Sequence, residues 1–318
     1  MHTITASVPA KIILFGEHAV VYGQPAVAVP VLDVRAHAEM IRIDERETAV
    51  IHASDLEIQY EFAAQKIPSK VKHIDEAMRF LIRQQMEIPE TGWRLDIRSD
   101  IPIGRGMGSS AAISVLLIRI MHQFVSIPLA MDDLIRLSYE LEKYHHGTPS
   151  GVDNTVVATS QPVYFIKGEP FELLEPAQFH LVIGDCGIGK KTGDVVADVA
   201  SAYKNDEKKY GELFQCIGDL ARFGRLMLEN GDHEGLGAAM NSNQTLLRQI
   251  NVSCDELENL ISAALSAGAC GAKLCGAGRG GCMVALAKNE QHAGKVKQAL
   301  DNAGAANSFY TRLKQEFQ

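Results

Sequence analysis

The chain has 318 residues, of which 46% are hydrophobic and 22% are charged, a composition typical of a globular protein with one large or two ordinary domains. The net charge of −8 and the lack of a Lys/Arg block argue against nucleic acid as the main partner, although a few local cations suffice to hold a small anion. No segment approaches the roughly 20 apolar residues of a membrane helix, and no signal peptide is recognisable, so we expect a cytoplasmic protein with no membrane partner.

The first hundred residues are rich in strand-forming sequence. Residues 3–16 contain β-branched residues, with a break expected at Pro9 before an apolar strand. Residues 26–44 and 93–102 are further extended stretches bounded by Gly, Pro and Asp. Between them, residues 71–86 place their apolar side chains at helical spacing, which predicts an amphipathic helix; these side chains are Ile74, Ala77, Met78, Leu81 and Ile82.

The remainder alternates helices with short strands. Residues 109–124 predict a buried helix, and residues 132–147 a second one that begins at Asp132 and Asp133 and ends at Gly147. A buried strand is expected at 180–187, helices at 201–230 and 257–268, and a glycine turn between two strand-like pieces at 272–287. The Pro-containing stretch 168–180 is the weakest connection, so we place two domains at 1–175 and 176–318.

A glycine-rich segment, PIGRGMGSSAA at residues 102–112, precedes the first buried helix. Gly104, Gly106 and Gly108 permit positive φ, and Ser109 and Ser110 supply hydroxyls at the helix start. The free N–H groups and the positive dipole end of such a helix attract phosphate oxygens. A glycine-rich turn with an ordinary serine N-cap is the alternative that this segment alone leaves open.

Two other glycine-rich stretches match nucleotide motifs less well. Residues 184–193 nearly spell a P-loop, but Lys191 occupies the position of the hydroxyl that holds magnesium. Residues 276–281 have G-x-G-x-x-G spacing, but a strand-like segment follows where a dinucleotide site needs a helix. Neither stretch is therefore assigned as a nucleotide site.

Candidate chemical groups lie in two other segments. Lys11, Glu17 and His18 flank one apolar strand; taken singly, they are equally explained as a surface lysine and a solvated Glu–His pair. Glu142 closes a helix, and a Gly/Pro/Ser turn leads to Asp153, a placement that suits a base, a metal ligand or a capping aspartate.

Histidine and cysteine give no metal signal. The adjacent His145 and His146 point in different directions and are interpreted as helix C-terminal residues. The six cysteines are scattered without a C-x-x-C pair and are interpreted as reduced, mostly buried residues.

Four motifs occur together in one order: PAKIILFGEHAVVYG at 9–23, PIGRGMGSSAA at 102–112, HGTPSGVDN at 146–154 and KLCGAGRGGCMVAL at 273–286. In this arrangement the chain resembles the GHMP kinase superfamily over essentially its whole length. The resemblance implies an α+β fold of two domains. Its N-terminal domain resembles domain 2 of ribosomal protein S5, and its C-terminal domain is ferredoxin-like.

Within the superfamily, GEHAVVYG followed by HGTPSGVDN is similar to the mevalonate kinase branch. The resemblance implies phosphorylation of the 5-hydroxyl of (R)-mevalonate by ATP, with Mg²⁺ as cofactor, in isoprenoid biosynthesis, and a homodimer. The presence of both Lys11 and Asp153 favours the 5-hydroxyl over the 3-hydroxyl. Another small-alcohol kinase or a phosphomevalonate kinase is the alternative within the superfamily, and an NAD-binding oxidoreductase is an alternative of a different class.

The resemblance also implies roles for individual residues. Asp153 corresponds to the catalytic base, Lys11 to the lysine that stabilises charge and polarises the hydroxyl, and Ser110 and Glu142 to the magnesium ligands. The phosphate loop comprises Gly104, Arg105, Gly106, Met107, Gly108, Ser109 and Ser110. Lys11 is also expected to contact the phosphates. Glu17 is expected to orient Lys11 and, with His18, Asp153 and Thr192, to lie at the mevalonate site. Arg279 departs from the usual glycine of the last motif, and it is expected either to touch the phosphates, to close the cleft or to point to solvent.

Overall fold

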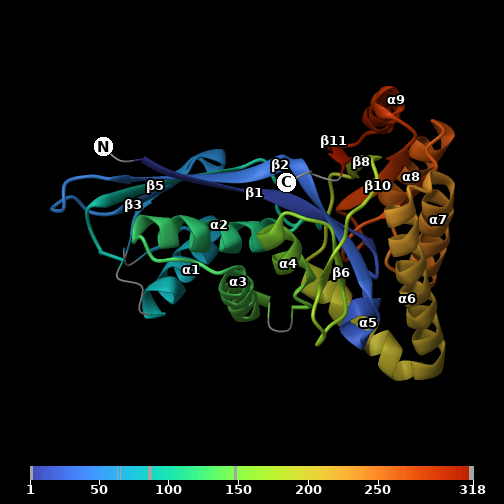
Figure 1. Cartoon of the computed structure of the whole chain (residues 1–318), viewed down its shortest axis with the longest axis horizontal. Helices are drawn as coiled ribbons and strands as arrows, with labels where there is room; N and C mark the ends of the chain where they lie inside the picture. The colour runs from blue at the N-terminus through green and yellow to red at the C-terminus, as the bar shows by residue number, and fades with distance from the viewer. Residues whose placement is uncertain (1–2, 63, 65, 85–87, 147–148, 315–318) are drawn as a thin grey trace. The chain divides into compact units, whose positions relative to one another are not determined.

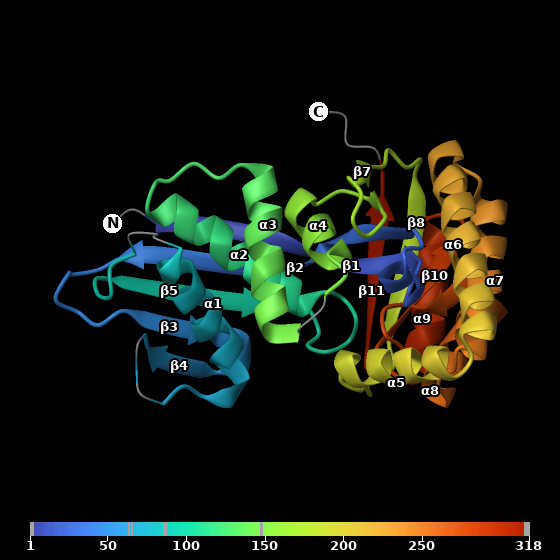
Figure 2. The ribbon, with the colours of Figure 1, turned by 90° about the horizontal axis from the view of Figure 1, so that it is seen from below.

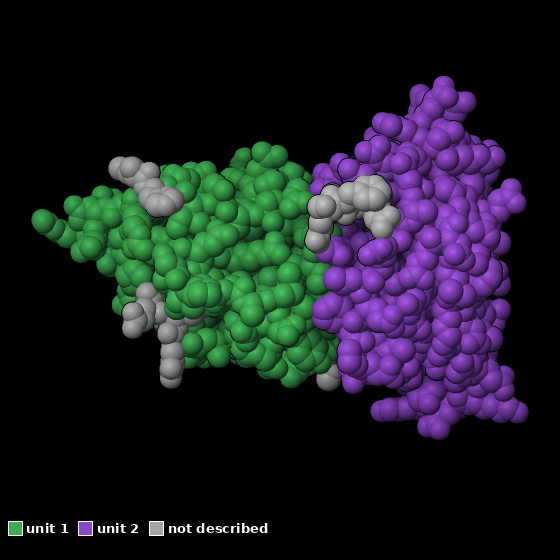
Figure 3. All heavy atoms as spheres, in the orientation of Figure 1, with its two compact units in different colours: residues 1–10, 34–102, 108–160 green, residues 11–33, 103–107, 161–318 purple. Residues whose placement is uncertain are grey.

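The structure, a computed structural model, describes residues 3–62, 64, 66–84, 88–146 and 149–314. The chain forms two compact units, coloured separately in Figure 3. Unit 1 contains residues 1–10, 34–102 and 108–160, and unit 2 contains residues 11–33, 103–107 and 161–318. Strands β1 (Thr3–Phe15) and β2 (Ala26–Arg42) contribute residues to both units, so no single cut divides them. The domain boundary expected at residue 175 stays a prediction.

Unit 1 is built on a mixed sheet with the order β4-β3-β5-β2, and β1 pairs with β2. Strand β5 runs antiparallel to β2 and parallel to β3. Helices α1, α2 and α3 cover one face of this sheet (Figures 1 and 2). The bounds are β3 Val50–Ala53, β4 Ile58–Glu61, β5 Trp93–Ser99, α1 Lys72–Arg83, α2 Ser109–Phe124, α3 Met131–His146 and α4 Val152–Thr159.

The predicted helices of unit 1 are confirmed, and their burial explains why they form. In α1 the apolar positions Ile74, Ala77, Met78 and Leu81 are buried, as their spacing requires. Helix α2 is buried along most of its length, because its sequence is apolar on every side. Helix α3 carries Asp132 and Asp133 in its first turn, where the helix dipole favours negative charge. Gly147, the predicted stop of this helix, lies outside the described residues.

The second sheet, in unit 2, has the order β11-β8-β10-β9 with antiparallel pairing throughout. Along the chain, β8 is followed by helices, then by β9 and β10, then by α9 and β11, which is the ferredoxin-like arrangement that the resemblance implies. Strands β6 and β7 extend the first sheet beyond the N-terminal part of β2. The bounds are β6 Val163–Phe165, β7 Glu172–Leu173, β8 Phe179–Asp185, β9 Gly271–Leu274, β10 Cys282–Ala287 and β11 Asn307–Leu313.

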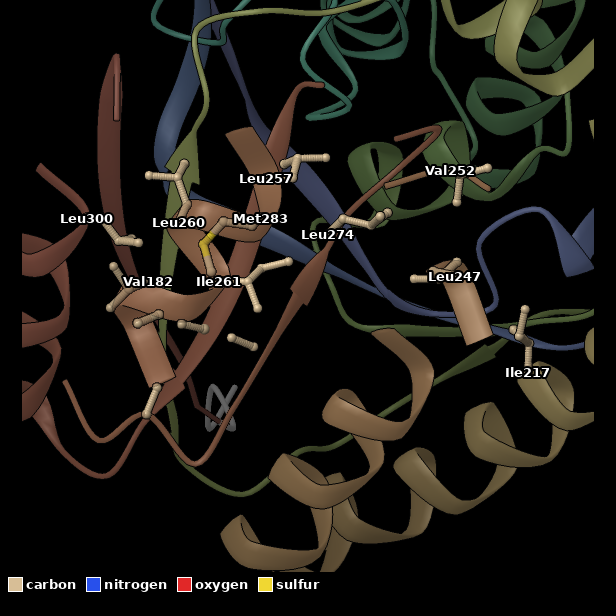
Figure 4. Close-up of a cluster of buried hydrophobic side chains, with 14 of the residues drawn as sticks. Val182, Ile217, Leu247, Val252, Leu257, Leu260, Ile261, Leu274, Met283 and Leu300 are labelled. Carbon is tan, nitrogen blue, oxygen red and sulfur yellow. The ribbon is translucent and has the colours of Figure 1, made fainter. Parts of the chain in front are cut away.

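The core of unit 2 lies between this sheet and its helices. Leu257, Leu260 and Ile261 of α8 meet Met283 of β10 and Leu300 of α9 in one buried cluster (Figure 4). Helices α6 and α7 pack on each other, and α7 packs on β9. The bounds are α5 Thr192–Asn205, α6 Glu207–Asn230, α7 His233–Gln249, α8 Asp255–Ser266 and α9 Glu290–Asn302.

Helix α7 completes the hydrogen bonding of the edge strand β9. The Asn241 Oδ1 accepts a hydrogen bond from the Ala272 N–H (3.0 Å), and the Gln244 Oε1 accepts one from the Leu274 N–H (3.0 Å). The side-chain amides thus replace the strand that an exposed edge lacks. Such a close approach requires glycine: a Cβ at Gly237 would lie 2.4 Å from the Cys270 carbonyl oxygen.

Two glycine-to-alanine changes in this unit are expected to have opposite effects. Gly237→Ala forces a methyl group against the β9 backbone and should lower the free energy of unfolding by about 1–3 kcal/mol. Gly211→Ala, inside α6 with open space around its Cα, should raise it by roughly 0.5–1 kcal/mol, because alanine loses less backbone entropy in a helix. Urea titrations monitored by circular dichroism measure both. A Gly237→Ala protein as stable as the parent would contradict this packing.

Three expectations need correction. Strand β1 is continuous through Pro9, because among the described residues it pairs only with β2 and such a strand tolerates a residue without an N–H. The single helix expected at 201–230 is divided at Asp206 into α5 and α6, and α7 and α9 were not predicted. All six cysteines are free, but only Cys275 and Cys282 are buried and Cys216 is exposed. Among the described residues, no helix is both long and apolar enough to span a membrane.

Candidate active site

The predicted catalytic lysine lies inside unit 2 and is not a surface residue. The Lys11 side chain is only 2% exposed. Its backbone N–H donates to the Met107 carbonyl oxygen (3.1 Å), so β1 is hydrogen-bonded to the glycine-rich segment at this point. Two motifs that are almost a hundred residues apart are therefore adjacent within one unit.

Glu17 and His18 follow the end of β1, and both are buried rather than solvated. Glu17 is 0% exposed; its carboxylate accepts hydrogen bonds from the Lys273 Nζ and from the Asn243 Nδ2 (3.1 Å). The His18 Nε2 lies 2.9 Å from the Ala277 carbonyl oxygen. A carbonyl only accepts hydrogen bonds, so Nε2 carries the proton.

The His18 ring is held in its neutral form. Desolvation by burial lowers its pKa, opposed by the hydrogen bond to Ala277, and the positive charge of Arg279 lowers it further. With the proton on Nε2, the Nδ1 atom of a neutral ring is a hydrogen-bond acceptor. This side chain is suited to receive a hydroxyl group.

The glycine-rich segment adopts the backbone that its spacing predicts. Gly104, Gly106 and Gly108 have φ values of 70°, 81° and 76°. Gly108 is the N-cap of α2, and Ser109 and Ser110 are its first two residues, so neither serine is the N-cap, and the phosphate role of the segment stays a prediction. Gly106 is also required by packing, because a Cβ there would lie 3.1 Å from the Cys275 carbonyl oxygen.

Arg105 anchors this segment to the end of β8. Its guanidinium donates to the Gly187 carbonyl oxygen (2.7 Å) and lies 3.4 Å from the buried carboxylate of Asp185. Its own carbonyl accepts the Cys282 N–H (3.1 Å). The arginine therefore fixes the backbone of the segment, and its predicted contact with phosphate stays a prediction.

In unit 1 the two predicted metal ligands touch each other. The Ser110 Oγ donates to the Glu142 Oε1 (2.6 Å), and the Ser114 Oγ donates to the same oxygen (3.2 Å). Glu142 is 6% exposed. A carboxylate and a hydroxyl are oxygen ligands of the kind that Mg²⁺ prefers.

Asp153 lies in the first turn of α4, two residues after the N-cap Gly151, which has φ 97°. Helices α2, α3 and α4 pack on one another. The elements that carry Ser110, Glu142 and Asp153 thus form one cluster within unit 1. Gly147 and Thr148 of the same motif lie outside the described residues, so the end of α3 at Gly147 stays a prediction.

The remaining sequence motifs have distinct surroundings. Thr192 is the exposed first residue of α5, and its predicted contact with mevalonate stays a prediction. The G-x-G-x-x-G stretch is followed by strand β10, which confirms that the helix of a dinucleotide site is lacking. The near-P-loop stretch packs against the glycine-rich segment, because a Cβ at Gly189 would lie 3.1 Å from the Gly104 carbonyl oxygen.

Comparison with known families gives two matches that together cover more than half of the chain. Residues 71–161 match the GHMP kinases N-terminal domain, and residues 213–306 match the GHMP kinases C-terminal domain. The chain belongs to the GHMP kinase family. The glycine-rich segment in the first half of the chain and the ferredoxin-like sheet in the second half are the features that the resemblance to this family implies.

Among its relatives, this GHMP kinase is similar to a mevalonate kinase of Pyrococcus furiosus, with 34% identity covering 95% of the chain and 93% of the relative. It is also similar in structure to an L. major mevalonate kinase in complex with R-mevalonate, with a TM-score of 0.87, 25% identity and coverage of 100% and 98%. A Streptococcus pneumoniae phosphomevalonate kinase shares the fold, with a TM-score of 0.80, 16% identity and coverage of 96% and 99%.

Arg279, the departure from the usual family motif, is not directed to solvent in this kinase. It has a φ of 52°, and its side chain pairs with Asp198 of α5 and donates to the Asn251 carbonyl oxygen (2.9 Å). The arginine therefore ties the glycine turn between β9 and β10 to α5 and to the segment before α8.

Sequence reasoning missed the partners that hold the predicted residues. Lys273, Asn243, Asp185 and Ser114 are all buried, and each contacts a predicted residue. One signal was available for Lys273: a charged residue inside an apolar strand needs a buried partner of opposite charge. That signal does not identify Glu17 as the partner.

Proposed function

We propose that this GHMP kinase transfers the γ-phosphoryl group of ATP to the 5-hydroxyl of (R)-mevalonate and releases 5-phosphomevalonate and ADP. The observation that carries the proposal is the similarity to mevalonate kinases over nearly the whole chain. The simultaneous presence of Lys11 and Asp153 supports the 5-hydroxyl as the acceptor. The relation to the phosphomevalonate kinase is at the level of the fold alone.

In this proposal Asp153 is the base. An alcohol is a poor nucleophile, and a carboxylate that accepts its proton makes the oxygen more reactive toward phosphorus. Lys11 polarises the hydroxyl and stabilises negative charge on the transferred group. Each is carried by a regular element of its own unit, because Asp153 lies in the first turn of a helix and Lys11 in a buried strand.

Ser110 and Glu142 are proposed to hold Mg²⁺. The contact between their oxygens supports this assignment, and Mg²⁺ is commonly bound by one or two carboxylates together with substrate phosphates and water. Among the described residues, no group of three His, Cys, Asp or Glu side chains is placed to hold a metal. When bound, the ion neutralises charge on the phosphates.

The segment from Gly104 to Ser110 is proposed to cradle the phosphates. The positive φ of its three glycines and the N-terminus of the 16-residue helix α2 support the role, because the first N–H groups of a helix have no partner within it. On the substrate side, His18 and Thr192 remain the proposed contacts of mevalonate, with the neutral His18 as an acceptor for a hydroxyl. Glu17, whose two carboxylate oxygens bind Lys273 and Asn243, is proposed to act through its neighbours.

A substrate panel tests the proposal directly. The purified protein is incubated with MgATP and mevalonate, phosphomevalonate, homoserine or galactose, and ADP release is followed by a coupled assay. Of these four substrates, we expect only mevalonate to be turned over, and phosphorus NMR of the product should show the phosphate on the hydroxyl of the primary carbon. ADP release with phosphomevalonate but not mevalonate, or tight NADH binding without ATP affinity, would overturn it.

Ser110→Ala is expected to raise the Mg²⁺ concentration needed for half-maximal activity about tenfold, because a ligand oxygen is lost. Ser138→Ala is the matched control: it removes another buried hydroxyl of unit 1, which donates to the Ile135 carbonyl oxygen and not to Glu142. The control should keep the parental magnesium dependence. If Ser110→Ala keeps it too, Ser110 does not belong to the metal site.

The kinase is also proposed to be a homodimer, an expectation that rests only on the resemblance to its family. Light scattering after gel filtration measures it: a mass near 69 kDa, about twice the 34.7 kDa of the chain, is expected, and a mass of one chain would refute it.

A further inference from the structure

The turn that carries His18 has a strained backbone. The Ala19 N–H donates to the Glu17 carbonyl oxygen (2.7 Å), and His18 between them has φ 60° and ψ −46°. These values describe a γ-turn of the rare non-inverse form. Such a conformation of a residue with a Cβ costs roughly 1–3 kcal/mol and persists only where its surroundings enforce it.

The residue before Glu17 contributes to this constraint through packing. A Cβ at Gly16 would lie 2.5 Å from both the Ala26 Cα and the Pro25 carbonyl oxygen, so the backbone at this point has no room to move toward β2. The Val20 N–H also donates to the Gly16 carbonyl oxygen (3.1 Å). Packing at Gly16 and this hydrogen bond therefore both restrict the backbone of the turn.

The side-chain contacts of Glu17 constrain the turn further. Lys273 and Glu17 form an ion pair in which both side chains are 0% exposed, and the Asn243 Nδ2 donates to the second carboxylate oxygen. The Lys273 Nζ also donates to the Leu274 carbonyl oxygen (2.6 Å). Its strand, β9, is in turn held to α7 through Asn241 and Gln244.

This ion pair is a costly way to stabilise a fold. Desolvation of two charges offsets much of their attraction, and apolar residues of similar volume give equal or greater stability. The Asn243 Oδ1 is buried without a hydrogen-bond partner, which is a further cost. Because the Glu17–Lys273–Asn243 group adds little stability and lies next to the strained turn of His18, its position points to a role in orienting that turn.

We propose that Lys273 and Asn243 are positioning residues. They hold Glu17, and through it keep His18 in its γ-turn with Nδ1 available to a hydroxyl of the alcohol substrate. This inference rests on the proposed function for the identity of that substrate. It assigns to Glu17 a role toward His18, in addition to the role toward Lys11 that the resemblance implies.

The double variant Glu17→Gln/Lys273→Met tests the inference, because it removes both charges without leaving one unpaired. We expect a KM for mevalonate at least about tenfold higher, corresponding to roughly 1.4 kcal/mol, and a KM for ATP within about twofold of the parent. The control Glu172→Gln/Arg225→Met removes an exposed ion pair of the same unit and should leave both constants unchanged. A folded double variant with both KM values unchanged would overturn the proposal.

A cycle with His18→Ala separates positioning from a general effect on the fold. If the pair acts through His18, its removal should not raise the KM for mevalonate further in a protein that already lacks this imidazole. An additive increase would contradict the proposal. Asn243→Leu, which removes one hydrogen bond to Glu17 and the unpaired Oδ1, provides a milder variant should the double variant not fold. We expect an increase of about threefold with it, and an unchanged KM would again count against the inference.

A readout independent of turnover distinguishes this inference from the proposed function. Nitrogen-15 shifts of the His18 ring should show the proton on Nε2 in the parent and a mixture of tautomers in the double variant. Were the parent inactive on mevalonate, the proposed function would fail, while the ring shifts would still decide the role of Lys273. Unchanged shifts in the double variant would refute that role.

Discussion

Asp153→Asn should abolish most of the turnover while leaving ATP binding within about twofold of the parent. The amide has nearly the same shape as the carboxylate but cannot accept a proton, so kcat should fall roughly 10²- to 10⁴-fold, the range typical of a lost general base. Because the change acts mainly in the transition state, the dissociation constant for MgATP should hardly move. Steady-state kinetics and titration calorimetry measure the two quantities.

The control is Asp255→Asn, which makes the same chemical change in the first turn of another helix, α8, at an exposed position. It removes the same favourable interaction with a helix dipole, about 0.3–1 kcal/mol, and should leave kcat unchanged. If Asp153→Asn also keeps its kcat, Asp153 is not the base. A capping role is already excluded, because Gly151 is the N-cap of α4.

The glycine-rich segment was predictable because its signal is local. Gly104, Gly106 and Gly108 are spaced two apart, and each needs a backbone that residues with a Cβ rarely adopt; all three have positive φ. The helices and strands around it were predictable for the same reason, since hydrophobic periodicity operates within one element. The strand–turn–strand arrangement of residues 272–287 is a further example.

The partners of the site residues were not predictable, because they come from distant parts of the chain. Lys273 is 256 residues from Glu17, and Asn243 lies on a helix that the sequence analysis did not predict. Local patterns show that a buried charge needs a partner, but the fold decides which one. The same limit applies to Arg279, whose contact with Asp198 spans 81 residues.

This difference has a consequence for the reading of family motifs. The motif around Glu17 was interpreted through Lys11, which lies in the same short segment, whereas the structure places both carboxylate oxygens against residues of α7 and β9. The motif at 273–286 was interpreted through its glycines, whereas Lys273 at its start makes the long-range contact. On our proposals, residues that position others therefore lie in the same motifs as residues that bind ligands.

Glu142→Gln is expected to weaken magnesium binding and, through it, the whole reaction. The glutamine oxygen can still accept the hydrogen bonds that Ser110 and Ser114 donate to Glu142, so the local packing of α2 against α3 is retained while the negative charge is lost. Mg²⁺ is a hard cation that favours charged oxygen ligands. We expect the Mg²⁺ concentration for half-maximal activity to rise about 10- to 100-fold, with partial recovery of kcat at saturating metal.

The matched control is Glu140→Gln, two residues earlier on α3. The Glu140 side chain is 45% exposed and paired with Lys143. Because an exposed pair of this kind contributes little to stability, the control should behave as the parent. If the Glu142→Gln enzyme kept the parental magnesium dependence, Glu142 would not be a ligand of Mg²⁺.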